Sequence, residues 1–82
     1  MIPKIKIEEI VSIISNKISV PVKKINENSK STDFYKWDSL AQLNIILEIE
    51  KKIDRKIDAS MMGELTSVKS IIDYLKKLNV IS

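Results

Sequence analysis

Residues 39–53 constrain the fold more than any other stretch, because their apolar side chains recur at the spacing of an α-helix. On a helical wheel, four of them form a stripe of the width that normally faces a protein core: Ile45, Ile46, Ile49 and Ile53. This stripe alone is sufficient to hold the helix against the rest of the protein.

A second apolar stripe runs along the neighbouring edge of the same helix and contains Leu40, Leu43 and Leu47. A small protein has little material left to bury it, so one interpretation is a surface that binds a partner. The other interpretation is a central helix that packs on two sides. Helical periodicity alone gives the two interpretations equal weight.

The start of this helix carries the pair Asp38-Ser39. Asp38 is a good N-cap, because its carboxylate can accept a backbone N–H that has no partner within the helix. Ser39 would then point its hydroxyl outward, where unpaired amides and the helix dipole stabilise a phosphate ester. A serine at a helix start is far more often structural than chemical, so the pair by itself is weak evidence.

The remaining patterns predict an all-α protein, a small antiparallel four-helix bundle of three longer helices and one short one. We expect helices over about 4–18 and from 67 to about 78, and a short helical turn within 60–64. A long loop over 19–37 joins the first two helices, with Ile25 and Tyr35 as its expected anchors and Trp37 partly buried.

Composition excludes several classes of function. Residues 1–82 are enough for a single small domain, and the chain contains no cysteine and no histidine. This excludes disulfide scaffolds, Cys/His zinc sites and Ser-His catalysis within the chain, so we expect neither catalytic nor metal-binding residues. No apolar run approaches membrane-spanning length, and we expect a cytoplasmic protein that does not insert into membranes.

The segment from Trp37 to Asp54, which contains Asp38-Ser39-Leu40, resembles the second helix of acyl carrier proteins. The hallmark of that helix is Asp-Ser-Leu followed by an apolar helix that ends in acidic residues. The resemblance continues through Ile57, residues 65–68 and residues 71–75, which are similar to the family's third and fourth helices. The long loop before Trp37 also suits the family, although Lys36 replaces a common glycine and Ser31 a position that is often apolar.

This resemblance implies a carrier rather than an enzyme. A separate phosphopantetheinyl transferase would attach 4′-phosphopantetheine from coenzyme A to Ser39, and Asp38 would help that enzyme recognise the site. The thiol of the arm would hold an acyl group as a thioester, which explains thiol chemistry in a chain without cysteine. The implied partners are the transferase and the enzymes that load and transfer acyl groups, and the implied state is a monomer.

The resemblance further implies that partner enzymes dock on the exposed face of the second helix, through Leu40, Leu43, Leu47 and Glu50. Ala41, Asn44 and Lys51 stand where the family usually has acidic residues. Because complementary charge sets encounter rates and partner choice, we expect poor docking to the enzymes of fatty-acid synthesis and a role in a specialised pathway. The basic residues around the end of this helix are also explained by ordinary capping electrostatics.

The family's interior acyl cavity would be lined, by position, by Ile49, Ile57, Met62, Leu65 and Ile71, which are equally well explained as plain core. An alternative within the same fold is a peptidyl or aminoacyl carrier. Alternatives from other classes are a helical adaptor and a small nucleic-acid-binding protein, the latter motivated by a pI of about 9.2 and by the lysine pairs at 23–24, 51–52 and 76–77. The chain has a single arginine and its charge is spread out, so no nucleic-acid partner is expected.

Overall fold

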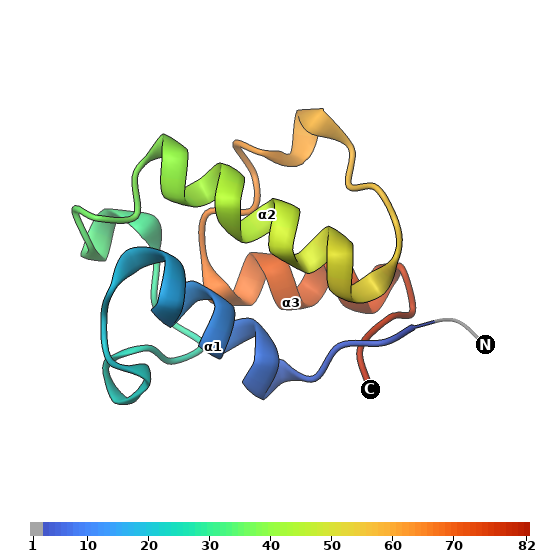
Figure 1. Cartoon of the computed structure of the whole chain (residues 1–82), viewed down its shortest axis with the longest axis horizontal. Helices are drawn as coiled ribbons and strands as arrows, with labels where there is room; N and C mark the ends of the chain where they lie inside the picture. The colour runs from blue at the N-terminus through green and yellow to red at the C-terminus, as the bar shows by residue number, and fades with distance from the viewer. Residues whose placement is uncertain (1–2) are drawn as a thin grey trace.

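Helices account for all the regular structure in residues 3–82, the part of the chain that the computed structural model describes. Within this range the α-helices are α1 (Ile7–Ile18), α2 (Ser39–Ile53) and α3 (Val68–Lys77), and 3₁₀ turns lie at η1 (Val22–Lys24), η2 (Ser31–Asp33) and η3 (Ala59–Met61). α1 runs opposite to α2 (Figure 1). α3 runs in the same direction as α2, because the segment between them carries the chain back toward the start of α2 (Figure 1). The predicted all-α bundle is confirmed, and the short helix is the turn η3.

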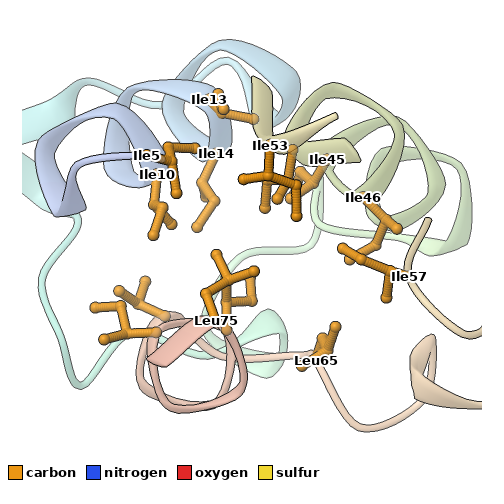
Figure 2. Packing of buried hydrophobic residues seen from close by; sticks show 14 of the residues in the cluster. Ile5, Ile10, Ile13, Ile14, Ile45, Ile46, Ile53, Ile57, Leu65 and Leu75 are labelled. Carbon is orange, nitrogen blue, oxygen red and sulfur yellow. The ribbon is translucent and has the colours of Figure 1, made fainter. Parts of the chain in front are cut away.

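The core is built mainly from isoleucine side chains that the three α-helices direct toward one another (Figure 2). Ile10 and Ile14 of α1, Ile45 and Ile49 of α2 and Leu75 of α3 are all completely buried. Burial of one such side chain contributes about 1.5–3 kcal/mol. The predicted core stripe of the second helix is therefore the stripe that the structure buries.

α1 begins later than the predicted start near Lys4. Ile5, two residues before the start of α1, pairs with residues near the other end of the chain: its N–H donates to the Val80 carbonyl at 2.8 Å, and the Ser82 N–H donates to the Ile5 carbonyl at 3.0 Å. Both Ile5 and Val80 are fully buried. Helical periodicity could not show this pairing, because residues at opposite ends of the sequence make it.

Backbone hydrogen bonds pin the long loop before α2 to the start of α3. The Ser31 N–H donates to the Thr66 carbonyl at 2.7 Å, and the Val68 N–H donates to the Ser29 carbonyl at 3.0 Å. These bonds fix the loop beside residues 66–68, although the two segments are far apart in sequence. As a result the loop, the start of α2 and the segment before α3 meet at one place.

The prediction of loop anchors is right for Ile25 and wrong for Tyr35. Ile25 is 7% exposed, whereas Tyr35 is 89% exposed. The Trp37 N–H donates to the Phe34 carbonyl at 2.9 Å and closes a turn. This turn directs Phe34 and Trp37 inward and leaves Tyr35 outside. Trp37 is also buried more completely than expected, with 5% of its surface exposed.

The longest helix in residues 3–82 is α2, with 15 residues. A helix needs about 20 mainly apolar residues to span a bilayer. None of the helices in the described range is long and apolar enough to do so.

Candidate functional site

The site is organised by the N-terminus of α2, where Asp38 caps the helix. Asp38 has an extended backbone, and its Oδ1 accepts the Ala41 N–H at 2.9 Å. Its carbonyl accepts the first intrahelical bond, from the Gln42 N–H at 2.9 Å. The predicted N-cap is confirmed, and it makes Ser39 the first residue of the helix.

Ser39 is exposed at this helix start, where the first backbone N–H groups have no partner within the helix. The partial positive charge of a helix N-terminus stabilises a nearby anion. Chemically, the position combines an accessible hydroxyl with a setting that favours a phosphodiester.

A pocket of about 400 Å³ lies directly beside Ser39. Three segments form it: the end of the long loop, the start of α2 and the segment between η3 and α3. Its lining residues are Ser31, Trp37, Asp38, Ser39, Gln42, Met62, Gly63 and Thr66. A group attached to the Ser39 hydroxyl therefore has a hollow to rest in.

Gln42 joins these three segments through its side-chain amide. Oε1 accepts the indole N–H of Trp37 at 2.6 Å, while Nε2 donates to the Leu65 carbonyl at 2.7 Å and to the Met62 carbonyl at 3.0 Å. Sequence reasoning missed this residue. The available signal was a polar side chain that continues the buried face of α2, three and four residues before Ile45 and Ile46.

The second apolar stripe of α2 faces solvent. Leu40 is 66% exposed, Leu43 43% and Leu47 44%. Tyr35 extends this edge, since it borders the same shallow hollow as Leu40 and Asn44. Of the two interpretations, the structure supports a helix that packs on one side and leaves the other uncovered.

The acidic side chains of α2 are engaged by the protein itself. A Glu48 carboxylate oxygen lies 3.8 Å from the Lys17 ammonium, and Glu50 is half-buried, with its Oε2 accepting the Ile57 N–H at 2.6 Å. Lys51, in contrast, is exposed. The uncovered face of α2 therefore offers apolar groups and positive charge rather than unengaged carboxylates.

The basic residues near the end of α2 also serve the fold. The Lys52 ammonium lies 3.8 Å from a Glu9 carboxylate oxygen, and the Arg55 guanidinium donates to the Leu78 carbonyl at 3.3 Å. Such cations also favour the negative end of the helix. These contacts agree with the interpretation that the basic residues around the end of α2 have a structural role.

The residues predicted to line an acyl cavity separate into two groups. Ile49, Leu65 and Ile71 are at most 1% exposed, and Ile57 is 8% exposed, all within the core cluster. Met62 is half-buried and lines the pocket beside Ser39. Figure 2 shows Ile57 and Leu65 reaching the same interior as the α2 isoleucines.

Comparison with known proteins decides the family. The model of the phosphopantetheine attachment site matches residues 8–75. The acyl carrier protein of Buchnera aphidicola subsp. Schizaphis graminum is 32% identical over 72 residues, covering 88% of this chain and 91% of that protein. The chain belongs to the acyl carrier protein family.

Two further acyl carrier proteins extend the match. The acyl carrier protein of Chlorobium phaeobacteroides is 31% identical, over 85% of this chain and 90% of that protein. The one of Thermotoga maritima is 28% identical, over 84% of this chain and 85% of that protein. As an acyl carrier protein, the chain is a carrier and not an enzyme, and its prosthetic group is covalently bound 4′-phosphopantetheine. The start of α2 fits this group, because it combines an exposed serine, the positive end of a helix and an adjacent pocket.

Proposed function

We propose that Ser39 is the attachment point of the phosphopantetheine arm and that the protein presents an acyl group to partner enzymes of a specialised pathway. The observation that carries this proposal is the exposed Ser39 hydroxyl at the N-terminus of α2, one residue after the Asp38 cap. The bound arm supplies the thiol that holds the acyl group as a thioester. The protein acts as a monomer in the cytoplasm.

The residues of the chain have separate tasks in this proposal. The positive end of the α2 dipole stabilises the negative charge of the phosphodiester at Ser39. Asp38 fixes the start of the helix, so that the hydroxyl is presented to a phosphopantetheinyl transferase. The pocket beside Ser39 receives the part of the arm nearest the protein.

Partner enzymes that load or remove the acyl group dock on the uncovered edge of α2. Leu40, Leu43 and Leu47 supply apolar contact there, and Glu50 lies at the rim with one oxygen already bonded to the Ile57 N–H. Asn44 and Lys51 give this edge no unengaged negative charge. Complementary partners therefore carry neutral or acidic surfaces, which supports a specialised pathway rather than fatty-acid synthesis.

The attachment site is tested by intact-mass measurement after incubation with coenzyme A, Mg²⁺ and a broad-specificity phosphopantetheinyl transferase. We expect a gain of one phosphopantetheine in the parent protein and none in Ser39→Ala. Ser60→Ala, which removes an exposed hydroxyl on η3, is the matched control and should gain the group normally. A gain that persists in Ser39→Ala would place the attachment elsewhere.

The choice of pathway is tested by titration against a ketosynthase of fatty-acid synthesis whose docking surface is basic. We expect weaker binding than that of a carrier with an acidic second helix. The double variant Asn44→Glu/Lys51→Glu should bind more tightly than the parent, because it adds two carboxylates to the docking edge. Equal affinity of the parent and the acidic carrier would contradict the specialised role.

A further inference from the structure

We infer that Gln42 closes the passage from the Ser39 pocket to the isoleucine core, so that the protein carries a short acyl group outside its core. This inference rests on the proposed attachment of the arm at Ser39. It assigns to Gln42 a role in selecting the cargo, through the three hydrogen bonds of its side chain.

The position of Gln42 makes it the floor of the pocket. Ser39 and Gln42 are three residues apart, so they lie on the same side of α2, and both line the hollow. The Gln42 side chain extends from the helix to the segment that carries the Met62 and Leu65 carbonyls, whose oxygens it reaches at 3.0 and 2.7 Å. A chain attached at Ser39 and entering between α2 and that segment must pass this bridge.

The bridge is buried and its hydrogen bonds are complete. Gln42 is 6% exposed and Trp37, which donates to it, is 5% exposed. Within residues 3–82, every buried side-chain nitrogen and oxygen has a hydrogen-bond partner. An acyl chain that displaced Gln42 would leave amide, indole and carbonyl groups unpaired in an apolar setting, which is strongly unfavourable.

The space behind the bridge is filled by apolar side chains. Ile46 is 4% exposed, and Ile49, Leu65 and Ile71 are at most 1% exposed. Such close-packed interiors admit an additional chain only by moving apart. A short acyl group can remain outside the core at little cost, whereas a long chain held outside the core would stay in contact with water.

The experiment compares acyl groups of increasing length on the same protein. Acetyl, butyryl and octanoyl forms are prepared from the corresponding acyl-coenzyme A with the transferase, and intact mass establishes loading. Tm and the methyl resonances of Ile49 and Ile71 are then measured. In the parent, we expect the Tm and the methyl resonances of Ile49 and Ile71 to be the same in the acetyl and octanoyl forms.

In Gln42→Ala, we expect the octanoyl group to enter the core. Relative to the acetyl form of the same variant, the octanoyl form should show shifted methyl resonances of Ile49 and Ile71 and a Tm higher by about 4 °C or more. A change in Tm of this size is readily measured in a domain of this size. Gln42→Met, which keeps the length of the side chain and removes the amide, gives the same comparison if the alanine variant does not fold. Ile13→Val loosens the core on α1 without touching the bridge and should behave as the parent does.

Three outcomes would overturn the inference. Octanoyl-dependent shifts of equal size in the parent would show that Gln42 does not close the core, and their absence from both Gln42 variants would show that another group closes it. Shifts in Ile13→Val would assign the effect to general loosening. A missing gain in mass at Ser39 is a different result, because it refutes the proposed attachment site and the inference with it.

Discussion

The two apolar edges of α2 contain side chains of the same chemical class and have opposite surroundings. Ile45, Ile46, Ile49 and Ile53 are at most 4% exposed, whereas Leu40, Leu43 and Leu47 are 43–66% exposed. The side chains of the buried edge point into the core between the helices (Figure 2), and those of the other edge are exposed to solvent. One edge holds the fold together, and the other is not covered by any described part of the chain.

Two further residues, one in α2 and one in the loop before it, support the same division. Gln42 lies on the buried side and joins α2 to the loop and to the segment before α3, so it keeps the pocket beside Ser39 in shape. Tyr35 lies on the exposed side and enlarges the apolar edge that begins at Leu40. Contiguous exposed apolar groups are typical of interaction sites. The comparison therefore predicts that substitutions on the two edges affect different properties.

The largest effect is expected on the buried edge. Ile49→Ala removes a completely buried side chain and leaves a cavity, which typically costs 2–5 kcal/mol. Small domains have only about 5–15 kcal/mol of stability. We therefore expect this variant to unfold at a much lower urea concentration than the parent, as measured by circular dichroism. A loss below about 1 kcal/mol would show that this edge is not the principal support of α2.

A smaller effect is expected at the N-cap Asp38, which precedes both edges. Asp38→Ala removes the acceptor of the Ala41 N–H and should cost about 1 kcal/mol. Asp38→Asn keeps an acceptor and should retain most of the stability, measured by urea unfolding of both variants. Because the cap also sets the position of Ser39, the alanine variant should be modified more slowly by the transferase. Equal stability of the alanine and asparagine variants would contradict the capping role.

The sequence predicts those parts of the molecule that depend on neighbours along the chain. The buried stripe, the Asp38 cap and the exposure of Ser39 follow from helical spacing and from the chemistry of a helix start. Two features depend instead on residues far away in sequence: Gln42 bonds to carbonyls 20 and 23 residues further on, and Ile5 pairs with residues 80–82. The prediction for Tyr35 is wrong for another reason, because a turn between Phe34 and Trp37 sets its direction and loop composition does not reveal that turn.

The smallest effect on stability, and the sharpest test of the comparison, is expected on the exposed edge. Leu43→Ser replaces a side chain that is 43% exposed, and surface substitutions of this kind usually change stability by no more than about 0.5 kcal/mol. Its partner in the comparison is Ile46→Ser, three residues further along α2 and 4% exposed, which places a hydroxyl in the core and should be severely destabilising. Leu43→Ser should keep its Tm and yet raise the KM of the transferase, because the proposed docking places the Leu43 side chain against the enzyme and not against the carrier's own core. If Leu43→Ser instead lowered Tm as Ile46→Ser does and left the KM unchanged, the exposed edge would belong to the fold, and the division of α2 into a structural and an interacting edge would be wrong.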